Sequence, residues 1–262
     1  MTILDTIIEK KRKEVALAQG QAPLSMLESY PLFSRKPYAL RESIMHKDRN
    51  GIIAEFKRAS PSKGIINNLS LVQDVVKGYE AAGVSAISVL TDPSFFKGSL
   101  DDLSKAREAV SIPILRKEFV IDTYQIAEAK AYGADAILLI AAVLTTEEIK
   151  LFSAYAKELE LSVLLEVHDA EELDRGIFET IDAIGVNNRN LKDFSVSIQH
   201  SLDLVNKIPD AFTKVSESGL SNPNTIKELK QAGFHGFLIG ENFMKEKDPA
   251  KAIKDFAAQL RS

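Results

Sequence analysis

The sequence predicts an α/β protein, a (β/α)8 TIM barrel with an N-terminal helical extension. After residue 50, eight short β-rich segments alternate with longer segments whose apolar residues recur at helical spacing. Several β-rich segments are almost continuously apolar, most clearly AILLIAA and SVLLEV, as is typical of parallel strands covered on both faces. Eight βα units within about 210 residues fit a barrel of ordinary size.

The residues before the first predicted strand form the extension. We expect a single domain over residues 1–262, in which residues 1–50 are the helical extension. A first helix is predicted over about residues 3–18, and Thr2 with Asp5 is typical of a capping box at its start. A second helix is predicted near residues 24–28, after Pro23. The first helix either covers the mouth of the barrel or packs beneath it.

The barrel elements follow from local patterns. Strands are predicted at residues 52–57, 86–91, 113–119, 136–141, 162–167, 183–187, 213–216 and 236–239. The clearest amphipathic helices are predicted at residues 71–82, 122–132, 145–159 and 224–232. Gly83, Gly133 and Gly233 each follow a helix shortly before a strand, so we expect left-handed backbone at these three positions.

An open, doubly wound sheet would show the same alternation of strands and helices. The count of eight units, and the absence of a Gly-rich dinucleotide or P-loop fingerprint from the sequence, favour the closed barrel. In a barrel the C-terminal ends of the strands build the active site, so polar residues at those ends carry functional information.

Composition excludes several classes of function. Lys and Arg number 33 against 37 Asp and Glu, and this net charge of -4 argues against nucleic acid as the main partner. The chain has no cysteine and four scattered histidines, so disulfides, a cysteine nucleophile and a metal site are not expected. The longest apolar stretch, residues 136–144, is too short to cross a bilayer, and the N-terminus does not resemble a signal peptide. We therefore expect a cytoplasmic protein without membrane association.

Charged side chains follow several predicted strands. Glu55 and Lys57 end the first strand, Lys117 lies in the third, and Glu166 lies near the end of the fifth. Side chains alternate in direction along a strand, so barrel closure is expected to bring these four groups together across the mouth. Lysines and glutamates coupled in this way can transfer protons. His168 lies two residues after Glu166, so its side chain is expected on the same side of the strand. A histidine at the rim of a barrel, however, more often has a structural role.

Glycine-bearing turns follow the last two predicted strands, in SESGLS (residues 216–221) and IGEN (residues 239–242). Backbone N–H groups in such turns often bind phosphate in barrels, so Ser218, Gly219 and Gly240 are candidate phosphate ligands. The loop KRASPSKG, residues 57–64, combines three cations with two serines and is suited to an anionic substrate. Phe96 and Phe119 offer aromatic walls next to these groups.

Taken together, these segments resemble the indole-3-glycerol-phosphate synthases. The matching segments lie in order along essentially the whole barrel: AEFKRASPSKG (54–64), VLTDPSFFKGS (89–99), ILRKEFVID (114–122), LLEVHD (164–169), IGVNNRNL (184–191), SESG (216–219) and FLIGENFM (237–244). FKRASPSKG is specific to the family, whereas SESG and IGEN also occur in related phosphate-binding barrels.

The resemblance implies a lyase of tryptophan biosynthesis that uses no cofactor and no metal. Its small-molecule substrate would be the phosphorylated anthranilate–ribulose adduct 1-(2-carboxyphenylamino)-1-deoxyribulose 5-phosphate. The enzyme would close the ring, release carbon dioxide and water, and leave indole-3-glycerol phosphate. We expect a monomer, with neither nucleic acid nor membrane as a partner. The chain ends soon after the last predicted strand, so we expect no second barrel fused to it.

The resemblance also implies roles for individual residues. Lys117 looks like the general acid that protonates the ketone-derived oxygen, and Glu166 looks like its partner in proton transfer during rearomatisation and dehydration. Three residues would position and polarise the substrate: Glu55, Lys57 and Asn187. Its carboxylate would contact Ser60 and Arg189, and its aromatic ring would contact Phe96, Phe119 and Leu191. Its phosphate would be bound by Ser218, Gly219, Gly240 and Glu241. At Glu241 we expect the backbone N–H to serve while the side chain turns away, because a carboxylate repels a dianion.

Three other functions remain open at this point. The chain could be another sugar-phosphate barrel, such as an isomerase similar to phosphoribosylanthranilate isomerase, which shares the two phosphate-binding turns. It could be a Schiff-base aldolase, although the sixth strand carries no lysine before Lys192. It could also be a catalytically silent ligand-binding barrel, against which the set of Lys57, Lys117 and Glu166 argues.

Overall fold

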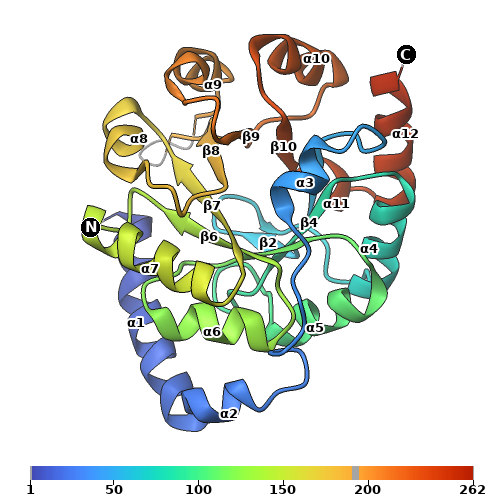
Figure 1. Ribbon diagram of the computed structural model, residues 1–262. Coiled ribbons are helices and arrows are strands. Elements are labelled where there is room, and N and C mark those ends of the chain that lie inside the picture. Colours follow the sequence, from blue (N-terminus) through green and yellow to red (C-terminus); the bar gives the residue numbers. More distant parts are fainter. Residues whose placement is uncertain (1, 191–194, 262) are drawn as a thin grey trace.

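A computed structural model describes residues 2–190 and 195–261 of the chain (Figure 1). Eight parallel strands close into a barrel in the order β1-β10-β9-β8-β7-β6-β5-β4, which confirms the predicted architecture and excludes the open sheet. The barrel strands are β1 (Ile52–Phe56), β4 (Ala86–Leu90), β5 (Ile114–Lys117), β6 (Ala136–Ile140), β7 (Ser162–Val167), β8 (Ala183–Asn187), β9 (Thr213–Glu217) and β10 (Gly236–Ile239).

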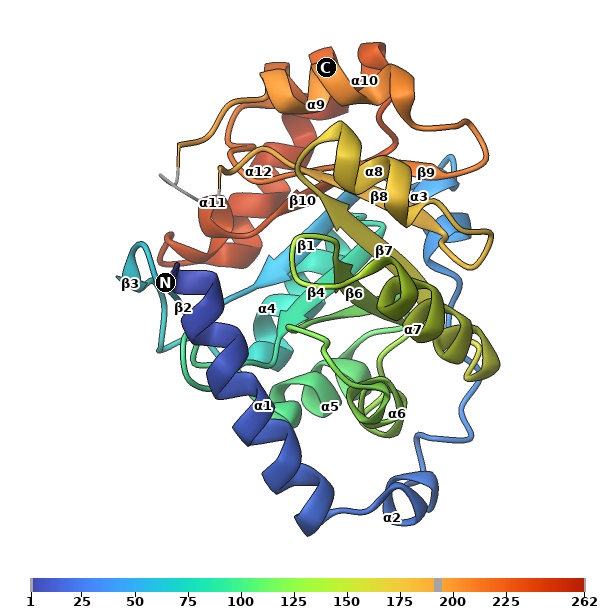
Figure 2. The same cartoon turned by 90° about the vertical axis from the view of Figure 1, so that its left-hand side faces the viewer.

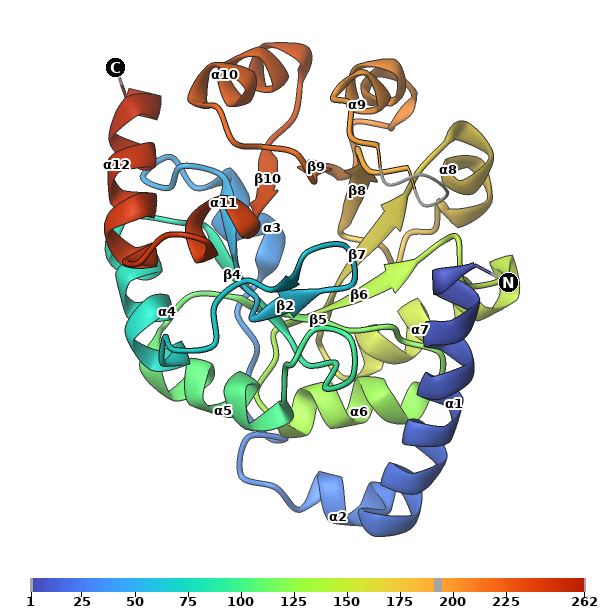
Figure 3. The same ribbon diagram turned by 180° about the vertical axis from the view of Figure 1, so that it is seen from behind.

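Helices lie around the outside of the barrel (Figure 3). They are α4 (Val72–Ala81), α5 (Leu100–Ala109), α6 (Thr123–Ala131), α7 (Thr146–Glu158), α8 (Ala170–Gly176), α9 (Gln199–Leu204), the short 3-10 helix η1 (Val205–Lys207), α10 (Pro223–Ala232), α11 (Glu241–Met244) and α12 (Pro249–Arg261). Among the described residues, no helix is long and apolar enough to span a membrane. Left-handed backbone at Gly83, Gly133 and Gly233 is confirmed, with φ of 81°, 89° and 111°.

The predicted strand bounds hold at β7, β8 and β10, and two other strands differ in a way that matters. The strand predicted over residues 113–119 covers only Ile114–Lys117, so Phe119 lies in the loop beyond β5. The strand predicted to end at Ser216 continues through Glu217, because Glu217 pairs with Asn187 in the register of β8 and β9. Glu217 therefore belongs to the ring of residues at the C-terminal strand ends.

Side chains inside the barrel form an apolar layer below these strand ends. A buried cluster joins Ile53, Leu115, Leu164 and Val215 with other inward-facing residues. Two positions further along the same strands lie Glu55, Lys117, Glu166 and Glu217, on the same side of each strand because side chains alternate. Charged groups thus sit on an apolar base, which lowers the local dielectric constant and strengthens their interactions.

The N-terminal extension consists of α1 (Ile3–Gln21), α2 (Leu24–Glu28) and α3 (Leu40–Met45). The capping box predicted at Thr2 and Asp5 is confirmed, and α2 has its predicted bounds. The third helix was not predicted. Leu40 and Ile44 on α3 join the apolar cluster inside the barrel, so α3 closes the end opposite the charged groups.

The start of α1 lies at the same side of the molecule as two small elements of the βα loops (Figure 2). These are α11 and the two-stranded hairpin of β2 (Ala59–Ser60) and β3 (Gly64–Ile65), which lies in the loop after β1. Further along, Val15 of α1 packs with Tyr124 and Ala127 of α6. The helix therefore runs from the mouth of the barrel down its side.

Candidate active site

A cavity of about 730 Å³ opens at the C-terminal ends of the barrel strands. This volume lies in the range of small-molecule sites. Thirteen of the fourteen residues that the sequence singled out line it: Glu55, Lys57, Ser60, Phe96, Lys117, Phe119, Glu166, Asn187, Arg189, Ser218, Gly219, Gly240 and Glu241. The remaining residue, Leu191, lies outside the described residues.

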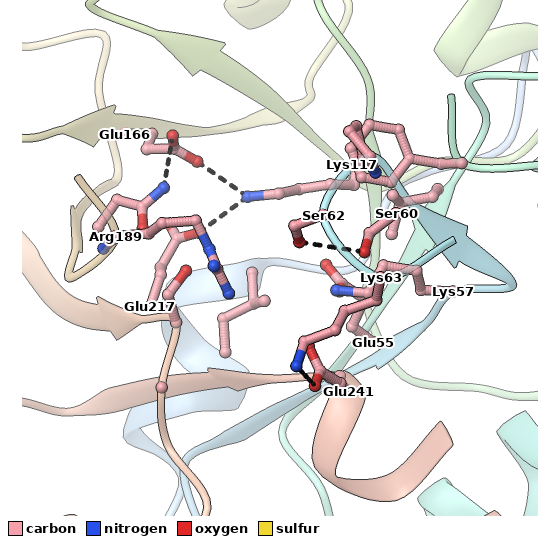
Figure 4. Close-up of a pocket in the computed structure, with 18 of the residues that line it drawn as sticks. Glu55, Lys57, Ser60, Ser62, Lys63, Lys117, Glu166, Arg189, Glu217 and Glu241 are labelled. Atoms are coloured by element: carbon pink, nitrogen blue, oxygen red, sulfur yellow. Dashed lines mark hydrogen bonds and ion pairs between the residues drawn. The ribbon is translucent and has the colours of Figure 1, made fainter. Parts of the chain in front are cut away.

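Lys117 stands at the centre of the charged groups (Figure 4). Its Nζ donates to Glu166 Oε2 at 3.0 Å and to Glu217 Oε2 at 2.8 Å. The Lys117 side chain is 17% exposed, and the side chains of Glu166 and Glu217 are 6% and 2% exposed. An ammonium group is thus held between two buried carboxylates at the edge of the cavity.

Burial and mutual charge set the protonation of this trio. Burial by itself would lower the pKa of Lys117, but the carboxylates of Glu166, Glu217 and Glu55 outweigh it and raise that pKa above its ordinary value. Burial would raise the pKa of Glu166, yet Lys117 and His168 hold it well below the usual range. Burial and the charge on Glu166 raise the pKa of Glu217 to about 7, despite Lys117. Near neutral pH, Lys117 is a cation, Glu166 is an anion and Glu217 is close to its midpoint.

A second ion pair lies at the end of β1, where Lys57 Nζ is 2.7 Å from Glu55 Oε1. The Glu55 carboxylate occupies space beside the backbone of Gly240. A Cβ added at Gly240 would lie 2.4 Å from Glu55 Oε1, which is closer than atoms approach. An added Cβ would also lie 2.8 Å from Glu55 Cβ, which cannot move as easily as the carboxylate. Glycine after β10 therefore makes room for the Glu55 side chain, since a φ of −125° does not itself need glycine.

Asn187 and His168 lie next to Oε1 of Glu166, whereas Lys117 binds Oε2. Asn187 Nδ2 donates to Glu166 Oε1 at 3.0 Å, and the Asn187 Oδ1 accepts from the backbone N–H of Arg189 at 3.0 Å. His168 Nε2 lies 3.6 Å from Glu166 Oε1, while its Nδ1 lies 3.1 Å from Glu172 Oε2. Burial would lower the pKa of His168, but Glu172 and Glu166 raise it overall. A histidine expected to have only a structural role thus contacts the central carboxylate.

Two aromatic rings form one wall of the cavity. The ring centroids of Phe96 and Phe119 lie 6.1 Å apart with an angle of 39° between their planes. Phe96 comes from the loop after β4, and Phe119 from the loop after β5. The two tilted rings give the cavity an apolar face of the kind that an aromatic ring contacts.

The glycine-bearing turns line the same cavity, together with residues of the hairpin after β1. Ser218 and Gly219 both have left-handed backbone, with φ of 70° and 74°. The Glu241 carboxylate faces Lys63 Nζ at 3.8 Å, so its charge is offset across the cavity (Figure 4). The expectation that this side chain turns away from an anion stays a prediction.

Sequence reasoning missed two parts of the site. Glu217 was left out because its strand was predicted to end one residue earlier. The first turn of α1 was left undecided, and the structure places Ile3, Leu4 and Ile7 in the lining of the cavity. The position of α1 depends on contacts between distant segments, so local sequence gives no signal for it. The pattern of a polar residue two positions after inward-facing Val215 would have identified Glu217.

Among residues 2–190 and 195–261, no group of three or more His, Asp or Glu side chains is arranged to hold a metal ion.

Comparison with known proteins decides the family. The family model described as indole-3-glycerol phosphate synthase matches residues 4–256. The chain belongs to the indole-3-glycerol phosphate synthase family. An indole-3-glycerol phosphate synthase of Bacteroides thetaiotaomicron is 46% identical over 259 residues, covering 99% of both chains. Those of Polaromonas sp. and Campylobacter fetus subsp. fetus are 43% and 42% identical, covering 96% and 98% of this chain and 96% and 100% of theirs.

Solved structures show the same fold at low identity. The 3-hexulose-6-phosphate synthase of Salmonella typhimurium superposes with a TM-score of 0.61 at 13% identity, covering 81% of this chain and 99% of the other. This likeness concerns the barrel alone. Membership of the indole-3-glycerol phosphate synthase family rests on the sequence matches, and it makes the chain a carboxy-lyase of tryptophan biosynthesis that acts on a small molecule.

Proposed function

We propose that this cavity converts 1-(2-carboxyphenylamino)-1-deoxyribulose 5-phosphate to indole-3-glycerol phosphate, with Lys117 as general acid and Glu166 as general base. The observation that carries the assignment is the Lys117 ammonium held between two buried carboxylates in the cavity wall. One group stays protonated and its neighbour stays ionised at the same pH, as acid–base catalysis requires.

Ring closure is the first step of the proposed mechanism. The aromatic carbon that bears the carboxylate attacks the ketone carbon, a carbon–carbon bond forms, and the carbonyl electron pair moves to oxygen. Lys117 gives that oxygen its proton, because an alkoxide is more basic than an amine. Loss of carbon dioxide then returns an electron pair to the ring. A well-placed acid contributes roughly 10² to 10⁴ in rate.

Dehydration completes the indole. Glu166 takes a proton from the carbon next to the new bond, and the hydroxyl leaves as water with a proton from Lys117. The electron pair of the broken C–H bond becomes the new double bond. Counting the substrate as a carboxylate, the sequence takes up one proton for each carbon dioxide released. Lys117 gives up two protons in all, of which one returns from Glu166 and the other comes from solvent.

The other polar residues orient the substrate in this proposal. Asn187 fixes Glu166, and Glu55 and Lys57 polarise and position the ribulose portion. Ser60 and Arg189, which line the cavity, contact the carboxylate that is lost. Phe96 and Phe119 contact the aromatic ring, with Leu191 as a further predicted contact. Ser218, Gly219, Gly240 and the backbone of Glu241 bind the phosphate. Lys57, which lines the same cavity, contributes its charge.

The test is turnover of purified protein with the anthranilate–ribulose adduct, followed by fluorescence of the indole product, with a metal chelator present. Indole formation that the chelator does not slow supports the assignment without cofactor or metal. Tight binding without product would contradict the acid–base roles and favour a silent binding barrel. Turnover of an aminodeoxyribulose phosphate in place of the adduct would favour an isomerase.

We further propose that the chain acts as one domain and as a cytoplasmic monomer, with neither nucleic acid nor membrane as a partner. Support for one domain comes from the cavity, which elements from α1 to α11 line together. The acidic composition does not favour binding to phosphate polymers. A single thermal unfolding transition and a monomeric mass from light scattering are the expected results. Two transitions, or a dimer mass, would contradict this proposal.

A further inference from the structure

A buried lysine on α1 joins two loops of the barrel. Lys11 is 3% exposed, and its Nζ lies 2.8 Å from Asp92 Oδ2 and 3.0 Å from Glu118 Oε1. It also lies 2.6 Å from Glu14 Oε2 on its own helix. Asp92 follows β4 and Glu118 follows β5, and both are almost fully buried. An ammonium group from the extension therefore bridges carboxylates from two neighbouring βα loops.

The second oxygen of Asp92 organises the loop that carries one aromatic wall. Asp92 Oδ1 accepts from the backbone N–H of Phe95 at 2.6 Å and of Phe96 at 3.3 Å. The loop is further tied to α1 by Ser94, whose hydroxyl donates to Glu14 Oε1 at 2.7 Å. The carboxylate that Lys11 contacts thus sets the backbone from which the Phe96 ring extends.

Glu118 has the same arrangement on the next loop. Its Oε1, which Lys11 contacts, also accepts from the backbone N–H of Phe119 at 2.8 Å. Its Oε2 accepts from the Thr91 hydroxyl at 2.9 Å, which joins this loop to the end of β4. One cation therefore fixes two carboxylates, and each carboxylate fixes the backbone of one of the two rings.

We propose that Lys11 is a positioning residue for the substrate's aromatic ring: through Asp92 and Glu118 it sets the spacing of Phe96 and Phe119. The proposal rests on the role given above to these two rings. It makes the N-terminal helix part of substrate recognition at a residue that does not line the cavity. An alternative role would be to anchor α1, whose residues Ile3, Leu4 and Ile7 line the cavity directly.

The test begins with Lys11→Met, which keeps the length of the side chain and removes its charge. We expect KM for the adduct to rise about tenfold or more with little change in kcat, because ring contacts are shared by substrate and transition state. Lys13→Met is the matched control, since Lys13 lies on the same helix and pairs only at the surface with Glu9 among the contacts described. An unchanged KM in folded Lys11→Met would overturn the proposal.

A double-mutant cycle separates positioning of the rings from anchoring of α1. In a Phe96→Ala/Phe119→Ala background, Lys11→Met should raise KM by clearly less than in the wild type, because the groups it positions are gone. Additive effects would overturn the proposal and assign Lys11 to α1 alone. If the phenylalanine variants leave KM unchanged, the aromatic wall of the proposed function fails, and this inference fails with it.

Lys11→Met leaves buried Asp92 without its cation and Glu118 with only Arg116 at 3.8 Å, so it is the variant at risk of not folding. Asp92→Asn is the second variant, because it removes the charge that Lys11 contacts and keeps an oxygen acceptor for the loop. We expect KM to rise in Asp92→Asn as well. In the Phe96→Ala/Phe119→Ala background, Asp92→Asn should raise KM by less than in the wild type. Circular dichroism establishes that each variant is folded, and unchanged KM in folded Asp92→Asn would count against the proposal.

Discussion

Lys117 donates a 2.8 Å hydrogen bond to Glu217, a carboxylate that belongs to the last residue of β9. Glu217 has a pKa raised to about 7, and its second oxygen, Oε1, is buried without a hydrogen-bond partner among the described residues. The acid of the proposed mechanism is therefore coupled to a group that titrates in the working range of pH.

Glu217→Gln should remove this titration. In the wild type the folded state holds a proton on Glu217 that the unfolded state has lost above about pH 4.5, so Glu217 makes stability fall as pH rises from about 4.5 to about 7. We expect the wild-type melting temperature to fall relative to that of Glu217→Gln between pH 5 and 7.5. The melting temperatures are measured by circular dichroism. If those of the two proteins change with pH in the same way across this range, the raised pKa of Glu217 is contradicted.

Lys117→Ala should lose most of kcat, about 10² to 10⁴-fold, because the ketone oxygen loses its acid. Substrate binding, measured at equilibrium, should change much less. Lys214→Ala is a suitable control, because Lys214 also lies in a barrel strand but pairs with Asp210 and does not line the cavity. Turnover of Lys117→Ala near the wild-type rate would remove Lys117 as the acid.

Lys57→Ala should raise KM and lower kcat together, since Lys57 is proposed both to bind phosphate and to polarise the substrate. The increase in KM should be smaller for an adduct that lacks the phosphate. A change in kcat alone would leave Lys57 without a phosphate role. Lys57→Arg keeps the cation and should recover part of the binding.

His168→Asn should move the acidic limb of the kcat/KM profile to higher pH. The cation of His168 helps to lower the pKa of Glu166, so its removal lets Glu166 take up a proton at a higher pH. His46→Asn is the control, because His46 is exposed and does not line the cavity. An acidic limb that does not move would mean that His168 only packs beside Glu166.

Gly240→Ala should destabilise the protein by about 1–3 kcal/mol, because the new Cβ would overlap the Glu55 carboxylate. Activity should fall with it, since Glu55 would be displaced from Lys57. Gly20→Ala serves as the comparison: a Cβ at Gly20 meets nothing within 4 Å, and alanine favours a helix. Equal melting temperatures for the two variants would show that the loop after β10 adjusts freely.

Local pattern was sufficient for the barrel and for most of the site. The continuous apolar strands, and polar residues such as Glu55, Lys117 and Glu166 two positions beyond buried ones, identify the mouth because strand periodicity is local. The last residue of β9 depends on a distant segment, because Glu217 extends the strand by pairing with Asn187 of β8. Helix α3 is six residues long and owes its position to Leu40 and Ile44 packing under the barrel, which no periodicity over so short a segment reveals.

The closure of the barrel by α3 has a consequence for the passage of reactants. The cavity ends on Leu138, Ile140 and Leu238, which belong to the same apolar cluster as Leu40 and Ile44. Among the described residues, Ile3 of α1 and the hairpin after β1 line the cavity away from this apolar base. We therefore expect a ligand bound between Ile3 and the hairpin to slow both the entry of substrate and the release of indole-3-glycerol phosphate.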